Sequence, residues 1–206
     1  MRLMRICAIV LAAGEGRRMG GPKALAMLGA DSFATAALRA FARPEIAQRV
    51  LVLGAAAERI ADAAALPADT AVVVNRRWQQ GMLTSVVAGL DAAQALDAEA
   101  VLLHPVDNPL VAPETVEAVI RALAGGARIA VPSHGGRRGH PASFARDAWP
   151  ALRAATADGG ARSVLAAHPE WVVHVPAGSD CLIDLDTPEA LAAAQRALRE
   201  PGAGRG

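Results

Sequence analysis

Apolar runs of strand length alternate with helix-length patterns along most of this chain, and this alternation is the feature that most constrains its fold. The runs are apolar at successive positions, as strands buried on both faces are. They lie at 6–14, 49–54, 71–75, 100–107 and 127–133, and helical patterns occupy 31–44, 55–66, 81–96 and 113–123. This order predicts a single-domain α/β fold, Rossmann-like, with a mostly parallel central sheet flanked by helices.

The last third of the sequence is less regular, although it contains no repeat and no linker. It comprises 137–144, 161–176 and a final helical pattern within 181–200. A chain of 206 residues suits one domain with one core. We expect that domain to span 1–200, followed by a flexible C-terminal tail at 201–206.

Charge and cysteine usage exclude several classes of protein. The formal net charge of +1 gives no support for a nucleic-acid or membrane-surface partner bound through a global field. The N-terminal apolar run is too short to span a membrane and ends in glycines and arginines. Cys7 and Cys181 sit in apolar runs without metal-ligand spacing, which is typical of core residues in a reducing compartment. We therefore expect a soluble, cytoplasmic protein; its oligomeric state stays open.

The stretch "AIVLAAGEGRRMGGPKALAMLG" (8–29) begins as a buried strand and then breaks into glycines and cations. A P-loop needs Gly-Lys followed by Ser or Thr, whereas here Pro22 precedes Lys23 and Ala24 has no hydroxyl. A dinucleotide fingerprint needs glycine at the position of Met19. Neither familiar phosphate loop fits, which also disfavours a Rossmann-type oxidoreductase.

The segment "LAAGEGRRMGGPK" resembles the L-A-A-G-x-x-x-R-M-G-x-x-K signature of nucleotidyltransferases that attach a nucleoside monophosphate to a phosphorylated acceptor. Small residues after the strand let backbone N–H groups approach a triphosphate, and cations offset the charge on the leaving phosphates. The resemblance implies nucleotide-binding roles for Leu11, Ala12, Ala13, Gly14 and Lys23, and catalytic roles for Arg18 and Lys23.

Two further segments resemble the metal-binding elements of that family. In "HPVDNPLV" (104–111), Asp107 stands where the family binds Mg²⁺, with nucleotide-binding and catalytic roles. In "DLDTPEAL" (184–191), the resemblance favours Asp184 as the second metal carboxylate, with Asp186 or Thr187 capping the last helix. Mg²⁺ held by one or two carboxylates is suited to bridging a triphosphate.

The remaining motifs concern the base and the acceptor. "WQQGMLTSVVAGL" (78–90) resembles the family's segment beside the nucleotide base and implies a base contact from Ser85. "RRGHPASF" (137–144) resembles a stretch of the molybdenum cofactor branch and implies an acceptor contact from His140. Because the strand-end segments 14–23, 54, 75–85 and 107–109 fall at carboxyl ends, we expect them to meet in one crevice.

Together these motifs make the chain similar to the molybdenum cofactor nucleotidyltransferases (MobA/MocA-like NTP transferases), and in particular to the cytidylyltransferases. Ala13, where guanylyltransferases usually have glycine, favours the smaller base. The resemblance thus implies transfer of CMP from CTP to the terminal phosphate of a molybdopterin-type acceptor, with Mg²⁺ and release of pyrophosphate. The alternatives are GTP as donor, a sugar-phosphate or methylerythritol-phosphate acceptor, and a nucleotide-binding domain without catalysis.

Overall fold

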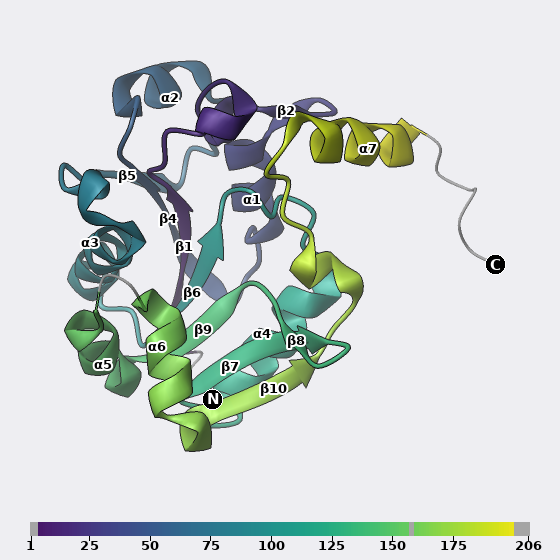
Figure 1. Ribbon diagram of the computed structural model, residues 1–206. Coiled ribbons are helices and arrows are strands. Elements are labelled where there is room, and N and C mark those ends of the chain that lie inside the picture. Colours follow the sequence, from purple (N-terminus) through teal and green to yellow (C-terminus); the bar gives the residue numbers. More distant parts are fainter. Residues whose placement is uncertain (1–3, 157–158, 200–206) are drawn as a thin grey trace.

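The computed structural model describes residues 4–156 and 159–199, and its centre is one mixed β-sheet (Figure 1). The strand order is β10-β7-β9-β6-β1-β4-β5, with the short β8 paired to β7. The strands are β1 (Ile6–Ala12), β4 (Ile46–Leu53), β5 (Thr70–Val74), β6 (Ala100–Pro105), β7 (Ile129–His134), β8 (Arg137–Arg138), β9 (Ala142–Ala145) and β10 (Val172–Pro176).

Most of the sheet is parallel, which confirms the predicted α/β architecture. β1 pairs in parallel with both β4 and β6, β4 with β5, and β7 with β10. β9 is the departure, because it runs antiparallel between β6 and β7. The apolar pattern predicts where strands lie, but it carries no information on the direction in which a strand runs. The inserted antiparallel strand could therefore not be predicted from it.

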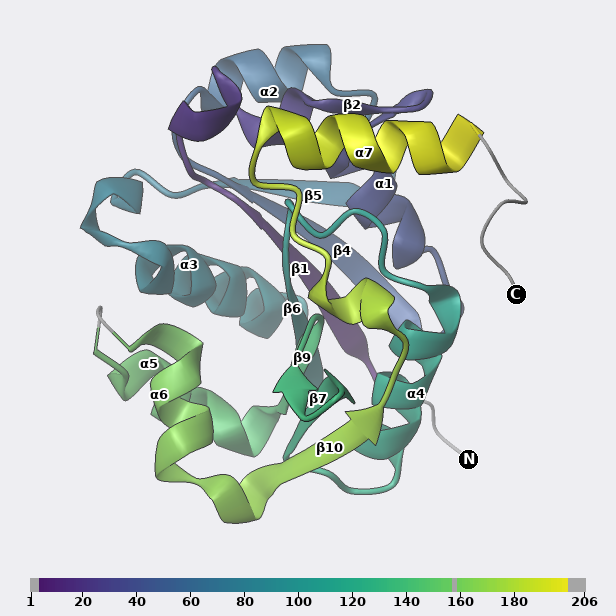
Figure 2. The same cartoon turned by 45° about the vertical axis from the view of Figure 1, so that its right-hand side comes forward.

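Helices cover both faces of the sheet (Figure 2). Side chains alternate along β1, so that Ala8 and Val10 face the core under α1 and α4, while Cys7 and Ile9 face the core under α3, α5 and α6. The helices are α1 (Phe33–Ala40), α2 (Ala57–Ala63), α3 (Met82–Ala95), α4 (Pro113–Ala124), α5 (Trp149–Ala154), α6 (Gly160–Ala167) and α7 (Pro188–Arg199).

The segment predicted as a helix from residue 31 starts with a β-hairpin instead. β2 (Met27–Leu28) pairs antiparallel with β3 (Asp31–Ser32), and α1 begins only at Phe33. Ser32 is the N-cap, because its side chain accepts a hydrogen bond from Thr35 N–H. This hairpin is the platform on which α7 packs, since Gln195 donates to the Met27 carbonyl.

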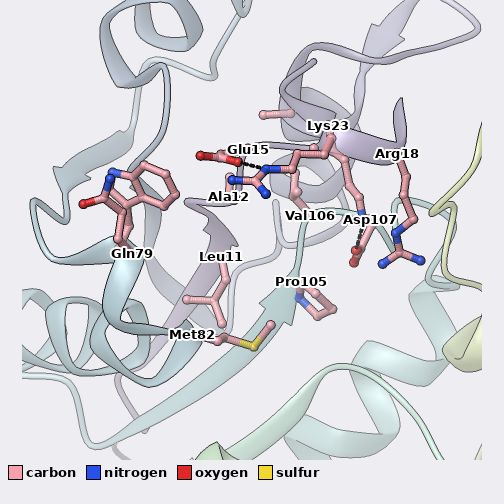
Figure 3. A pocket seen from close by; sticks show the side chains of 15 residues that line it. Leu11, Ala12, Glu15, Arg18, Lys23, Gln79, Met82, Pro105, Val106 and Asp107 are labelled. Carbon is pink, nitrogen blue, oxygen red and sulfur yellow. Dashed lines mark hydrogen bonds and ion pairs between the residues drawn. The ribbon is translucent and has the colours of Figure 1, made fainter. Parts of the chain in front are cut away.

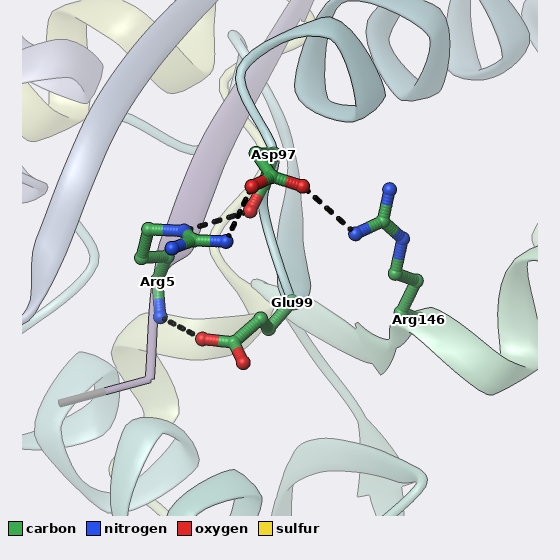
Figure 4. A network of polar contacts seen from close by, with 4 residues as sticks. All are labelled: Arg5, Asp97, Glu99 and Arg146. Atoms are coloured by element: carbon green, nitrogen blue, oxygen red, sulfur yellow. Dashed lines mark hydrogen bonds and ion pairs between the residues drawn. The ribbon is translucent and has the colours of Figure 1, made fainter. Parts of the chain in front are cut away.

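A polar network ties β1 to its neighbours at the amino end of the sheet (Figure 4). The Arg5 guanidinium donates to the Asp97 carbonyl at 2.8 Å and to its carboxylate at 2.7 Å, and Arg5 N–H donates to Glu99 at 2.9 Å. Arg146 adds a contact of 3.3 Å to Asp97. These contacts fix the start of β1 against β6, far along both strands from their carboxyl ends.

Three expectations concern the cysteines, a membrane-spanning helix and the C-terminal tail. Cys7 and Cys181 are both buried and unpaired, as expected for core residues. No helix within the described residues is long and apolar enough to cross a membrane. The predicted flexible tail at 201–206 lies outside the described residues.

Candidate active site

A cavity of about 620 Å³ opens where β1 and β6 end, within the usual size range of ligand pockets (Figure 3). The loop after β1, the end of β6 and the start of α3 contribute its walls. The predicted convergence is therefore confirmed for the segments 14–23, 75–85 and 107–109, whereas Gly54 is outside the lining. Six of the predicted site residues line it: Leu11, Ala12, Gly14, Arg18, Lys23 and Asp107.

Glycine sets the shape of the loop between β1 and Lys23. Gly16 has φ +67°, and a Cβ there would lie 1.9 Å from the Gly21 carbonyl oxygen, so no larger residue fits. Met19 N–H and Gly21 N–H both donate to the Gly16 carbonyl and close a tight turn. A Cβ on Gly14 would meet nothing within 4 Å, which leaves this part of the backbone open to a ligand.

Lys23 lies between two carboxylates at one side of the cavity. Its Nζ donates to Asp107 Oδ2 at 2.7 Å and also to Asp186 Oδ1. Arg18 Nη1 lies 3.5 Å from the other oxygen of Asp186. The Lys23 and Asp107 side chains are only 18% and 22% exposed, so these charges act through a partly desolvated environment.

Burial and pairing shift the pKa values of this cluster in different directions. Burial raises the pKa of Asp107 above its usual range, although the hydrogen bond from Lys23 opposes the shift. Burial also works against the charged form of Lys23, but its hydrogen bonds to both carboxylates prevail and raise its pKa. The hydrogen bond from Lys23 lowers the pKa of Asp186. The two carboxylates are thus balanced by two cations, the Lys23 ammonium and the Arg18 guanidinium.

The second carboxylate of the cluster belongs to Asp186, and not to Asp184 as the sequence favoured. Leu185 N–H donates to the Asp107 carbonyl at 2.7 Å, which anchors the segment beside the cavity. Asp186 then faces Lys23, whereas Asp184 is exposed. Thr187 is the helix cap, because its hydroxyl accepts from Ala190 N–H in α7.

The two residues predicted to select the base do not line the cavity. The Ala13 carbonyl accepts a hydrogen bond from Ala55 N–H. The methyl group of Ala13 is not part of the cavity wall, so it does not narrow the cavity. Ser85 is buried and its hydroxyl accepts from Asn75 Nδ2 at 3.0 Å, so it holds the end of β5 to α3.

Several cavity residues were missed from the sequence. Met82 is 67% exposed although it is large and apolar, and it lines the cavity beside Pro105 (Figure 3). The other additions are Glu15, Arg17, Trp78, Gln79 and Val106. The signal available was their place inside the motifs 11–23, 78–90 and 104–111, although the resemblance gave none of them a role.

His140 lines a second cavity of about 320 Å³ that adjoins the first. The two cavities share Leu11, Met82 and Pro105. His140 is largely buried, its Nδ1 has no hydrogen-bond partner in the described part of the chain, and burial lowers its pKa. The ring is therefore neutral near pH 7 and lies beside the nucleotide-sized cavity, outside its lining.

Comparison with known families assigns the fold and the reaction class. The family described as "MobA-like NTP transferase domain" matches residues 8–172. The chain belongs to this family. It is a nucleotidyltransferase of the MobA/MocA type, and Asp186 comes from a segment beyond the matched residues.

Relatives of full length carry the comparison further. The chain is 34% identical to a molybdenum cofactor guanylyltransferase of Cereibacter sphaeroides, over 96% of this chain and 99% of that one. A guanylyltransferase of Rhodobacter capsulatus is 30% identical over 96% and 98%. A 2-C-methyl-D-erythritol 4-phosphate cytidylyltransferase of Streptomyces avermitilis is 37% identical, but over 63% of this chain and 54% of that one. The full-length relatives thus give no support to the CTP prediction and fit the GTP alternative better.

A solved structure agrees with the fold. The protein Rv0371c of Mycobacterium tuberculosis superposes with a TM-score of 0.80 and 27% identity, over 95% of this chain and all of that one. The same protein has also been solved in complex with manganese, with a TM-score of 0.77.

Proposed function

We propose that this enzyme transfers GMP from GTP to the terminal phosphate of a molybdopterin-type acceptor and releases pyrophosphate. The observation that carries the transfer is Lys23 held between Asp107 and Asp186 at a cavity whose glycine loop exposes its backbone. The full-length guanylyltransferase relatives support the choice of GTP and of the acceptor.

The carboxylates of the cluster fit a divalent cation. The carboxylates of Asp107 and Asp186 both contact the Lys23 ammonium. A cation at the position of that ammonium is therefore within reach of both carboxylates. No group of three or more metal-binding side chains occurs within residues 4–156 and 159–199. Mg²⁺ suits such a site, because it is usually held by one or two carboxylates together with substrate phosphates and water. When bound, it would neutralise charge on the triphosphate.

The chain's own residues then bind and orient the substrates. We propose that the loop from Gly14 accepts the triphosphate and that Lys23 and Arg18 stabilise the charge gathering on the leaving pyrophosphate. A phosphate monoester has its second pKa near 6, so the acceptor is mostly a dianion at pH 7 and needs no general base. One acceptor oxygen forms a bond to the α-phosphorus while the bond from that phosphorus to the bridging oxygen breaks.

The test is a substrate matrix. Purified protein receives GTP, CTP or ATP with Mg²⁺, and molybdopterin, a sugar 1-phosphate or methylerythritol phosphate, while pyrophosphate release is followed. We expect GTP with molybdopterin to be the fastest pair, by about tenfold or more over CTP, a difference of about 1.4 kcal/mol. Faster turnover with CTP would restore the cytidylyl assignment. Turnover only with another acceptor would move the enzyme to that branch, and no release with any pair would indicate nucleotide binding without catalysis.

We also propose a cytoplasmic location. Two unpaired, buried cysteines suit a reducing compartment. Fractionation of cells that express a tagged chain tests this, and recovery in the membrane or periplasmic fraction would contradict it.

A further inference from the structure

The second cavity differs chemically from the cavity proposed to bind the nucleotide. Its walls are mostly apolar and come from β1, α3, β6 and β9. On another side lie Gly159 and Gly160 and the first residues of α6, including Arg162. A ligand bound here needs a largely apolar, ring-like body together with a group suited to the polar end.

Arg162 supplies a cation at this polar end. It is exposed, and it forms no hydrogen bond or ion pair with any described residue. Its positive charge nevertheless acts on the neighbouring His140 and, in addition to burial, lowers the pKa of that ring. The sequence pattern had left this arginine unassigned.

A second observation also indicates a ligand. The His140 ring lines the same cavity, and its Nδ1 is buried without a partner in the described structure. Leaving a buried polar atom unpaired is costly, so an orphan beside a cavity is a common mark of a binding site. Gly160 (φ +51°) has no atom within 4 Å of its Cβ position, which leaves the start of α6 open on this side.

We propose that this second cavity is the acceptor subsite and that Arg162 binds an anionic oxygen group of the acceptor. The inference rests on the proposed function for the acceptor's chemistry, a phosphate monoester with a flat heterocyclic body. Leu11, Met82 and Pro105 form the boundary that both cavities share, so an acceptor here lies next to a nucleotide in the first cavity. Arg162 is a positioning and specificity residue, whereas Lys23 and Arg18 serve the triphosphate.

The experiment compares Arg162→Gln and Arg162→Lys with a matched control, Arg196→Gln. Arg196 is an exposed arginine of α7 that lines neither cavity. The first readout is the Kd for inorganic phosphate, by calorimetry with saturating Mg-GTP. The second is the pair of KM values for molybdopterin and GTP.

We expect Arg162→Gln to raise the phosphate Kd and the molybdopterin KM by about 10- to 100-fold, the usual range for losing a hydrogen bond to a charged group. Arg162→Lys should recover part of the loss, and the KM for GTP should stay within about twofold. Equal phosphate binding by Arg162→Gln and Arg196→Gln would overturn the inference, as would a loss confined to the KM for GTP. Should no acceptor be turned over, the proposed function fails, while the phosphate titration still decides the role of Arg162.

Discussion

The Lys23 ammonium is the residue-scale centre of the site, because both carboxylates that could hold a metal accept a hydrogen bond from it. Binding of a divalent cation to Asp107 and Asp186 would compete with this arrangement and free the ammonium to face a triphosphate. The Lys23 side chain would thus balance the carboxylates in the metal-free state and the leaving phosphates in the metal-bound state. A role of this kind depends on charge more than on packing.

Replacing that charge tests the assignment. We expect Lys23→Ala to lower kcat by about 10²- to 10³-fold, which is typical for the loss of one electrostatic stabiliser. Arg196→Ala is the control, since Arg196 is exposed and lines neither cavity. Steady-state kinetics, with circular dichroism to check the fold, provide the measurement. Near-normal turnover by Lys23→Ala would remove this residue from the mechanism.

The two nearby aspartates offer a matched pair. Asp186→Asn should raise the Mg²⁺ concentration needed for half-maximal activity by at least about tenfold, because it removes a carboxylate from the Lys23 cluster. Asp184→Asn should leave that concentration unchanged, since Asp184 lies outside the cluster. Titration of activity with Mg²⁺ distinguishes them, and the reverse pattern would return the metal role to Asp184.

His104 makes the stability of the fold depend on pH. It is fully buried, and burial together with the nearby His140 ring lowers its pKa to about 3, although its bond to the Asn108 carbonyl opposes the shift. Below pH 6.5 the unfolded chain binds a proton that the folded chain refuses, so the free energy of unfolding falls as pH falls toward 3. Between pH 6.5 and 5 the loss is about 2 kcal/mol.

Urea unfolding at several pH values measures this loss. His104→Gln keeps a hydrogen-bond donor but cannot be protonated, so its unfolding free energy should decline less over the same interval. An identical pH slope in both proteins would show that other groups cause the decline.

At the scale of elements, the sequence predicts much of this molecule. Buried apolar runs place five of the strands, and the glycine-rich break after β1 places the loop that lines the cavity. The direction of a strand and the orientation of a side chain are not predicted in this way, because both depend on partners that are distant in sequence. Asp184 and Asp186 occupy an irregular segment. Bonds from Leu185 N–H to the Asp107 carbonyl and from Asn108 Nδ2 to the Ile183 carbonyl hold this segment so that Asp186 faces Lys23. Ser85 likewise turns inward because Asn75, from another strand end, binds it.

The packing of α3 on β1 gives an element-scale prediction. A Cβ on Gly89 would lie 2.6 Å from Ile9 Cγ2, so Gly89→Ala should destabilise by about 1–3 kcal/mol through overpacking. Alanine gains up to about 1 kcal/mol in helix propensity, which is too little to offset the clash. In an Ile9→Ala background the clash is gone, and the same change should be neutral or stabilising. Chemical denaturation of the four proteins completes the cycle, and additive effects would contradict it.

At the scale of the whole molecule, the two ends of the sheet have separate tasks. The cavity takes residues from three regions far apart in sequence, around Gly14, Met82 and Asp107, and all lie past the carboxyl ends of strands. Asp186 joins them through its contact with Lys23. The network of Arg5, Asp97, Glu99 and Arg146 holds the amino end. A ligand that bridges the distant segments should therefore stabilise the entire fold, whereas the amino-end network should act on stability alone.

This separation predicts how ligands and variants shift thermal unfolding. At 100 times its Kd, Mg-GTP should stabilise the fold by about 2.7 kcal/mol, which raises the Tm by roughly 5–10 °C for a chain of this size. Asp97→Asn keeps a residue that tolerates the positive φ of +59° at this position. It should lower the starting stability by less than about 1 kcal/mol, because the ion pairs of Asp97 are exposed, and should keep the full ligand shift. Asp107→Asn should fold but lose most of the shift, and at equal concentration Mg-CTP should shift the wild-type protein less than Mg-GTP. Differential scanning calorimetry gives all four values. A full Mg-GTP shift in Asp107→Asn would mean that the nucleotide binds without this carboxylate, and a larger shift with CTP would favour cytosine in the first cavity.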